Sequence, residues 1–189
     1  MHSANEVLDF WFGSPLTTQP RPEWFRKDPD FDERIRQRFG AALAQALGGG
    51  LQDWALTPTG ALARILVLDQ FTRNTLRDTA RAFAGDALAL AQAQALVQDG
   101  GHLALSPLQR WFAYLPFEHA EDLALQHESL RLFAALAAEH PAMADAEYWA
   151  RKHFEIIERF GRYPHRNAQL GRASTPEEEV FLSQPGSSF

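Results

Sequence analysis

The sequence predicts an all-α protein, and three observations support that fold class. Apolar residues recur at helical spacing, most clearly in the stretch FDERIRQRFGAALAQAL, where every fourth position is apolar. Capping residues precede most of these stretches. No segment combines strand-like alternation with the turn residues of a hairpin. We therefore expect about eight helices in a single domain over residues 1–189, with residues 184–189 as a loose tail.

The first two helices are predicted from their ends. Ser3 and Glu6 form a capping box ahead of the apolar stretch VLDFWF. After a proline-rich loop, Asp30 with Glu33 is expected to cap the second helix. Three glycines at 48–50 should end that helix, because glycine readily adopts the left-handed conformation found just after a helix C-terminus.

Later helices share a start signal in which Ser or Thr is followed by proline, a residue suited to the first helical turn. Such pairs stand at Thr57-Pro58, Ser106-Pro107 and Thr175-Pro176. A long Ala/Leu helix is expected over roughly residues 80–98, and a short helix should end near Leu115. Two further helices are expected to begin at Pro116 and after Pro141.

The composition restricts the classes of protein to which the chain can belong. It is 46% apolar, contains no cysteine and has a formal net charge of −6. Disulfides, thiol nucleophiles and cysteine metal sites are therefore excluded, and the acidic surface argues against general nucleic-acid binding. No signal peptide or membrane-spanning stretch is visible, so we expect a soluble cytoplasmic protein without a membrane partner.

One region is basic within this acidic chain. Between Arg151 and Arg172 there are six Lys or Arg residues against two Glu. The part GRYPHRNAQLGR also contains His165, Arg166 and Asn167. Arginine suits fixed, planar contacts with carboxylate or phosphate groups. These arginines are expected either to bind an anion or to cap the carbonyl groups at helix C-termini.

A second polar cluster interrupts the apolar helix LVLDQFTRNTLR. Asp69 and Arg73 are four positions apart and share one helix face, and Asn74 lies near that face. The plain interpretation is an intrahelical ion pair with Asn74 at the helix end. The functional interpretation is that this face lines a polar cleft, because a half-buried arginine needs more acceptors than Asp69 provides.

The third cluster is the stretch FEHAED, at the start of the helix expected from Pro116. Glu118, Glu121 and Asp122 are expected in its first turn, where the helix dipole favours acidic residues. His119 stands among these carboxylates, which should fix its ring and raise its pKa. A histidine and a carboxylate placed in this way can act as general acid and base.

Other chemical motifs are absent from the sequence. It contains no Walker A sequence, no G-x-G-x-x-G, no H-E-x-x-H and no G-x-S-x-G. The Glu-x-x-His pairs of di-iron bundles are missing as well. We therefore predict no metal site, and no motif identifies a cofactor.

Several segments follow one another in a characteristic order: VLDFWFG, LDQFTRN with AFAGDALAL, LPFEHAEDLALQ, and RFGRYPHRNAQLGRASTPEEEVFL near the end. Together they cover nearly the whole chain and resemble the bacterial family known as domain of unknown function 924. The resemblance implies a tetratricopeptide-like superhelical arrangement of helices, and it supplies no activity. One departure is Thr72, where the family usually has proline.

Two functional hypotheses use the same three clusters. In the first, the clusters converge on a cleft for a small anionic ligand, with His119 as the proton carrier and Glu121 or Glu118 as its carboxylate partner. The ligand-binding side chains would be Asp69, Arg73, Asn74, His165, Arg166 and Asn167. In the second, a helical-repeat surface grips a peptide without catalysis.

A third interpretation of the clusters is purely structural. In that case they would form a buried network that ties the C-terminal segment to the helices, and removing one partner would destabilise the fold. RNA binding is disfavoured, because few stacking aromatics accompany the basic segment. We therefore expect no nucleic-acid partner.

Overall fold

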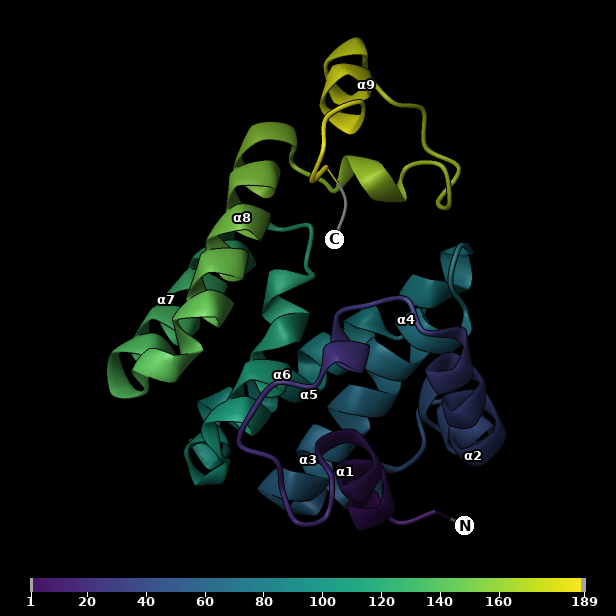
Figure 1. Ribbon diagram of the computed structural model, residues 1–189, viewed down its shortest axis with the longest axis vertical. Helices are drawn as coiled ribbons and strands as arrows, with labels where there is room; N and C mark the ends of the chain where they lie inside the picture. Colours follow the sequence, from purple (N-terminus) through teal and green to yellow (C-terminus); the bar gives the residue numbers. More distant parts are fainter. Residues whose placement is uncertain (1, 188–189) are drawn as a thin grey trace.

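The protein is built from helices joined by short turns, and the computed structural model describes residues 2–187 (Figure 1). The α-helices are α1 (Ala4–Phe12), α2 (Pro29–Leu47), α3 (Pro58–Ile65), α4 (Thr72–Thr75), α5 (Asp86–Gln98), α6 (Pro107–Glu118), α7 (Leu123–Glu139), α8 (Ala144–Phe160) and α9 (Pro176–Leu182). Shorter 3₁₀ turns are η1 (Pro22–Trp24), η2 (Gln52–Leu56), η4 (Ala80–Phe83), η5 (Gly101–Ala104), η6 (Pro141–Met143) and η7 (Pro164–Arg166). The remaining segment, η3 (Leu66–Phe71), is π-helical.

The fold class agrees with the prediction. Because α3, η3 and α4 follow one another without a break, residues 2–187 contain eight separate helical rods. None of these residues forms a strand. Within the same range, no helix has both the length and the apolar character that crossing a membrane requires.

The Ser and Thr residues predicted to cap helices do so. Each accepts a hydrogen bond from the backbone N–H three residues later. They are Ser3, Thr57, Ser106 and Thr175. The predicted cap at Asp30 is wrong, since the carboxylate of Asp28 caps α2 by accepting from the N–H of Phe31 at 3.0 Å. Pro29 explains this earlier start, because proline suits the first helical position.

Two predicted helix boundaries are also wrong. The helix expected over residues 80–98 begins only at Asp86, because Gly85 separates α5 from the turn η4. The helix expected to begin at Pro116 does not exist, and α6 instead continues through that residue. A proline removes one hydrogen bond without ending a helix that its neighbours hold in place. The next helix begins after Asp122, whose carboxylate caps α7.

The main core is aromatic and lies among α1, α2, η3 and α6. Trp11 packs against Trp24, Phe31, Phe71 and Phe112, with ring centroids 5.5–6.0 Å apart. Helices α7 and α8 lie side by side and pack on α6 (Figure 1). These contacts place the end of α6 between the aromatic core and the pair of helices α7 and α8.

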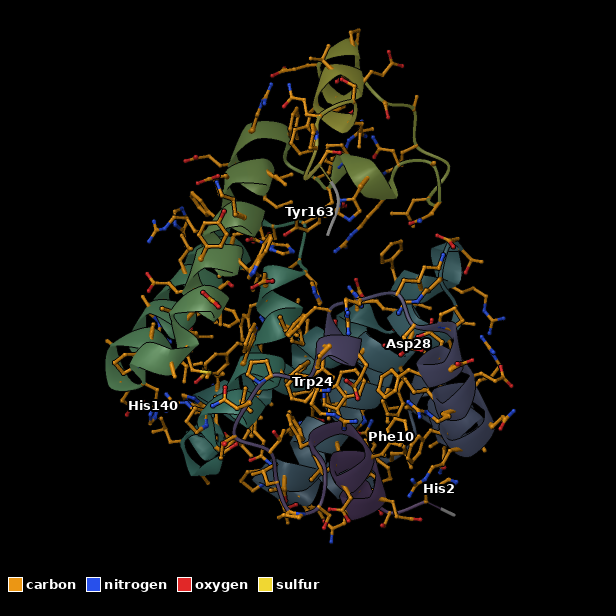
Figure 2. The ribbon with its side chains drawn as sticks, viewed as in Figure 1. His2, Phe10, Trp24, Asp28, His140 and Tyr163 are labelled. Atoms are coloured by element: carbon orange, nitrogen blue, oxygen red, sulfur yellow. The ribbon has the colours of Figure 1, made fainter. Side chains whose placement is uncertain are left out.

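The C-terminal segment has its own small apolar cluster. Residues 161–187 turn back over the end of α8 at Gly161, which has a left-handed φ of 66° (Figure 1). The buried Tyr163 packs there with Ile156 and Ile157, apart from the core around Trp24 (Figure 2). Ser187 donates a hydrogen bond to the α9 backbone, so residues 184–187 stay near that helix. The rest of the expected loose tail, residues 188–189, lies outside the described residues.

The segment η3 is a feature that the sequence did not indicate. All six of its residues are buried. A π-helical turn contains one extra residue and leaves carbonyl groups without their usual helical partners. The hydroxyl of Thr72 lies 2.8 Å from the carbonyl oxygen of Leu68 and 3.0 Å from that of Asp69, and it donates to them. Thr72 thereby supplies hydrogen bonds that a proline could not.

Gly85 allows α5 to approach η3 closely. A Cβ atom at this position would lie 2.1 Å from the carbonyl oxygen of Leu68, far inside van der Waals contact. The carbonyl oxygen belongs to the backbone of η3, and a Cβ would be fixed to the backbone just before α5. Neither atom could move aside, so a side chain at this position would push α5 and η3 apart. The absence of a side chain at Gly85 therefore allows the next residue, Asp86, to lie beside η3.

We expect Gly85→Ala to lower the free energy of unfolding by about 3 kcal/mol, the cost of overpacking a rigid contact. Gly40→Ala is the matched control, because a Cβ there meets nothing within 4 Å and α2 gains about 1 kcal/mol from the better helix former. Urea denaturation of both variants measures the difference. Equal stability of the two variants would contradict the close approach of α5 to η3.

Candidate functional site

Segments that are distant in the sequence meet around one cavity of about 360 Å³. Its walls come from η3, η4, α5, the end of α6, the start of α7 and the C-terminal segment. The polar side chains on these walls are Asp69, Asp86, His119, Glu121, Asp122 and Arg166. A cavity of this volume falls within the roughly 300–1,000 Å³ range of small-molecule sites. All three polar clusters of the sequence thus contribute residues to one place.

Asp69 and His119 form the central pair of this cavity. Asp69 Oδ1 lies 2.7 Å from His119 Nδ1, while Asp69 Oδ2 accepts a hydrogen bond from Gln70 at 2.6 Å. Burial alone would raise the pKa of Asp69, but the charge of Arg73 and the interaction with His119 lower it below its ordinary value. Asp69 is therefore ionised and can only accept hydrogen bonds. The ring of His119 must then carry a proton on Nδ1, the nitrogen that faces Asp69.

His119 is a neutral base near neutral pH. Burial lowers its pKa, the charge of Arg73 lowers it further, and the opposing effect of Asp69 is smaller. The sequence had predicted a raised pKa and a pair with Glu118 or Glu121, whereas the structure pairs His119 with Asp69, 50 positions away. Among the described residues, none forms a hydrogen bond with His119 Nε2. That nitrogen keeps a lone pair on a residue that lines the cavity.

Arg73 is paired with two carboxylates, and its Nη1 also donates to the backbone carbonyl oxygen of Asp69 at 2.8 Å. Its Nη1 and Nη2 donate to the two carboxylate oxygens of Asp86 at 2.8 and 3.0 Å, and Nη1 also lies 3.1 Å from Asp69 Oδ1. Burial tends to lower the pKa of Arg73, but these two acids raise it above its ordinary value. The predicted pair of Asp69 with Arg73 is thus present, and Asp86 supplies the additional acceptors.

Arg166 differs from Arg73 in having few acceptors. Its Nη1 donates to the carbonyl oxygen of His119 at 3.1 Å, and Asp86 is 3.6 Å away, beyond hydrogen-bond distance. The guanidinium lies 4.4 Å from the ring centroid of Tyr163 and 4.8 Å from that of Phe83. Its Nε is buried and has no hydrogen-bond partner among the described residues. Burial and the nearby Arg73 lower the pKa of Arg166, so its charge is incompletely compensated.

A second histidine–carboxylate pair lies behind the first. Glu118 Oε1 is 3.2 Å from His153 Nδ1, and the rings of His119 and His153 are 6.2 Å apart. Burial, followed by the charge of Asp69, raises the pKa of Glu118 to about 8. Burial, followed by the charge of His119, lowers the pKa of His153 to about 3. At neutral pH this second pair is therefore uncharged.

Glu121 holds the C-terminal segment in place. Its two carboxylate oxygens accept from Arg172 at 2.6 and 2.9 Å, and one of them also accepts from the N–H of Tyr163 at 2.8 Å. Burial tends to raise the pKa of Glu121, but these hydrogen bonds lower it. Glu121 is thus an ionised structural partner of Arg172, although it also borders the cavity.

The two predicted asparagines and His165 do not border the cavity. Asn74 donates to the carboxylate of Asp32 at 2.7 Å and so faces α2. Asn167 lies within the C-terminal segment, where it donates to Glu178 at 3.3 Å. Burial, followed by the charge of Arg166, lowers the pKa of His165 to about 4. These side chains belong to the supporting structure around the cavity.

Four residues of the cavity and its surroundings were missed in the sequence. Phe83 and Asp86 lie outside the polar clusters, His153 looks like an ordinary helix residue, and Tyr163 lies within the basic segment but was not singled out there. For Asp86 a signal existed, since Gly85-Asp86 follows a short apolar stretch and could mark a helix start facing the arginines. Among residues 2–187, no group of three or more His, Asp or Glu side chains is arranged to hold a metal ion.

Comparisons with known proteins find one family and one similar solved structure. Residues 7–186 match the family model described as bacterial protein of unknown function (DUF924). The chain is also similar to a solved structure, that of protein of unknown function ATU0120 from Agrobacterium tumefaciens. The two share 39% identity with a TM-score of 0.86, over 95% of this chain and 96% of the other. A comparison with curated proteins finds no match.

The protonated state of Glu118 predicts a specific pH dependence of stability. Its pKa is raised from 4.5 to about 8, so between these values the unfolded chain ionises this carboxyl while the folded protein keeps it protonated. The free energy of unfolding therefore falls as the pH rises. Glu118→Gln keeps the shape of the neutral acid but cannot ionise, so its free energy of unfolding should not fall in this way as the pH rises. We expect the variant to exceed wild type by a few kcal/mol at high pH, at about 1.4 kcal/mol per pKa unit.

The measurement is urea denaturation of wild type and Glu118→Gln at pH 5 and pH 8. The two proteins should be similar at pH 5 and should diverge at pH 8, with the variant more stable. Glu158→Gln, at an exposed position on α8, is the matched control and should show no such divergence. A constant difference between wild type and Glu118→Gln across this range would contradict a neutral, buried Glu118.

Proposed function

The chain belongs to the DUF924 family of bacterial proteins of unknown function, and we propose that its polar cavity binds a small molecule through an anionic group. In this proposal Arg166 binds the anion and His119 exchanges a proton with the bound molecule. The candidate ligands are small organic acids or phosphate esters, because both offer the oxygen acceptors that a guanidinium binds.

The observation that carries the proposal is the state of Arg166. A buried guanidinium without enough acceptors is costly, and proteins usually supply partners for every buried polar group. Here Nε has no partner among the described residues, and the carboxylate of Asp86 lies 3.6 Å from Nη1, beyond hydrogen-bond distance. A bound carboxylate or phosphate in the cavity would supply the missing negative charge beside this guanidinium.

The proton-transfer part of the proposal rests on His119. Its Nδ1 proton is held by Asp69 at 2.7 Å, which fixes the ring and leaves the lone pair on Nε2. A neutral imidazole whose orientation is fixed by a carboxylate is the usual arrangement of a general base. In a ligand held by Arg166, His119 would remove a proton from a hydroxyl group, a water molecule or a carbon acid near the anionic group.

The volume of the cavity favours a small molecule over a peptide. About 360 Å³ suits a compound of small-molecule size, whereas an extended peptide needs a long open groove. The peptide-binding hypothesis is linked to a tetratricopeptide-like superhelix, which we retain as an arrangement implied by the family resemblance. The antiparallel packing of α7 on α8 is compatible with one helical pair of such a repeat.

The tautomer of His119 can be measured directly. Long-range ¹H–¹⁵N spectra at pH 7 should show a neutral His119 ring with its proton on Nδ1. Asp69→Asn should slow the reaction of Nε2 with diethyl pyrocarbonate several-fold, because the carboxylate increases the basicity of the ring. Asp145→Asn, at an exposed position on α8, is the control. A proton on Nε2 in the wild type would exclude His119 as a base toward the cavity.

Anion binding can be tested with inorganic phosphate and glycolate. We expect the Arg166 Nε–H resonance to shift on titration, with a Kd on the order of 1 mM for such small ligands. Ala87→Trp should weaken binding at least tenfold, because Ala87 is an exposed residue of α5 that lines the cavity. If neither anion shifts this resonance and Arg166→Ala only destabilises the fold, the network is structural and this proposal fails.

A further inference from the structure

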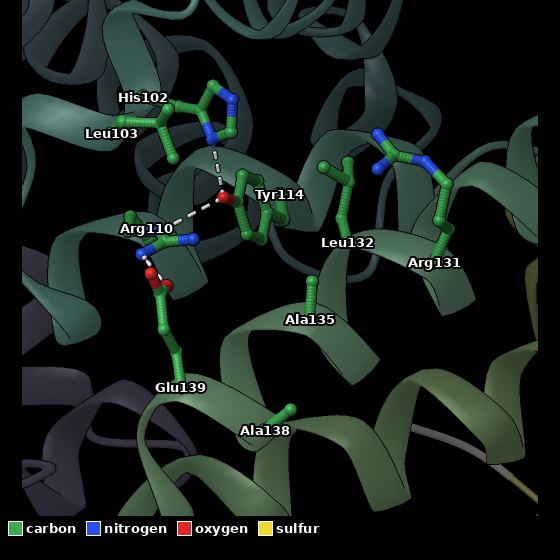
Figure 3. Close-up of a pocket in the computed structure, with 9 residues that line it drawn as sticks. All are labelled: His102, Leu103, Arg110, Tyr114, Arg131, Leu132, Ala135, Ala138 and Glu139. Carbon is green, nitrogen blue, oxygen red and sulfur yellow. Dashed lines mark hydrogen bonds and ion pairs between the residues drawn. The ribbon is translucent and has the colours of Figure 1, made fainter.

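A second cavity of about 520 Å³ lies on another part of the molecule, between η5, α6 and α7 (Figure 3). It shares no lining residue with the first cavity. Its side chains are of two kinds, as Figure 3 shows. Arg110, Arg131, His102 and Glu139 provide charged and polar groups, while leucines and alanines provide apolar wall.

The guanidinium of Arg110 is held rigidly within this cavity. Only 7% of its side chain is exposed, and its Nε donates to the hydroxyl of Tyr114 at 3.1 Å. Because that hydroxyl accepts from Arg110, its own proton is directed to His102 Nδ1, 2.6 Å away (Figure 3). Tyr114 is completely buried, so this chain of hydrogen bonds positions Arg110 before any ligand arrives.

The carboxylate that pairs with Arg110 is poorly fixed by comparison. Glu139, at the end of α7, accepts from Arg110 Nη1 (Figure 3), but 55% of its side chain is exposed. An exposed glutamate can rotate into water at little cost, whereas a buried arginine left without a partner is costly. A carboxylate from outside could therefore take the place of Glu139 without leaving the arginine unpaired.

The apolar wall begins next to this position. Leu132 is buried at its base, while Leu103 is 63% exposed at its rim. Ala135 and Ala138 are exposed on α7 and leave room above the helix. Exposed apolar surface beside a fixed cation suits a molecule with an anionic head and an apolar chain.

We propose that this second cavity binds a small monocarboxylate with a short apolar chain. The carboxylate replaces Glu139 on Arg110, and the chain lies along Leu103, Leu132 and Ala135. This site is separate from the cavity around His119, so the two proposals can fail independently.

Isothermal titration of the full chain with acetate, hexanoate, octanoate and octylamine tests the proposal. Octanoate should bind about fifteenfold more tightly than hexanoate, since each of its two added CH₂ groups contributes about fourfold. Acetate lacks the chain and octylamine carries the wrong charge, so neither should bind in this cavity, and their titrations should be the same for wild type and Ala135→Trp. Glu139→Gln should strengthen octanoate binding several-fold, because it removes the competing carboxylate.

Two alanine-to-tryptophan variants locate the binding. Ala135→Trp fills this cavity from an exposed position on α7 and should abolish octanoate binding. Ala87→Trp fills the other cavity in the same way and should leave octanoate binding unchanged. The proposal is overturned if octanoate does not bind, if octylamine binds equally well, if Ala135→Trp binds like wild type, or if Glu139→Gln weakens binding.

Discussion

The buried carboxylate of Asp69 is the group on which the rest of the site depends. It is 1% exposed, and removing a carboxylate from water costs several kcal/mol unless hydrogen bonds and an opposite charge compensate. Gln70, Arg73 and His119 supply that compensation. Because His119 comes from the end of α6, satisfying one carboxylate also fixes where α6 ends relative to η3.

The basic C-terminal segment is explained by the acids that it meets. Arg162 pairs with Glu178 and Arg172 pairs with Glu121, so an acidic protein uses these arginines to close its last segment onto its helices. Such pairs compensate one another and leave little charge for a ligand. Arg166 is the exception within the described segment, since it has no acceptor at hydrogen-bond distance except a backbone carbonyl. The sequence alone does not tell which arginines pair with an acid and which could bind a ligand. That difference becomes clear only when the structure shows where the acids lie.

Local rules predicted most of the helices and failed where tertiary packing decides. The caps at Ser106 and Thr175 depend on neighbouring residues alone, so the sequence contains all the necessary information. The continuation of α6 through Pro116 depends on packing, which no local pattern reveals. The site shows the same limit. Asp69 and Arg73 were predicted from their spacing, whereas the pairing of Asp69 with His119 joins distant segments that only the fold brings together.

Four titratable side chains meet at the end of α6 and differ in charge at neutral pH. They are Asp69, Glu118, His119 and His153. Asp69 and Glu118 are both buried, and the charge of Asp69 contributes to the raised pKa of Glu118, so only one of the two carboxyls is ionised at neutral pH. Neighbouring acids whose pKa values are pushed apart are how proteins place a base and an acid in one site. Here the ionised Asp69 holds the His119 proton on Nδ1, while His153 Nδ1 donates to the carbonyl oxygen of Trp149 at 2.9 Å and lies 3.2 Å from Glu118. Burial is the main cause of the raised pKa of Glu118, and Glu118 does not line the cavity, so its neutral carboxyl fits a structural role behind His119.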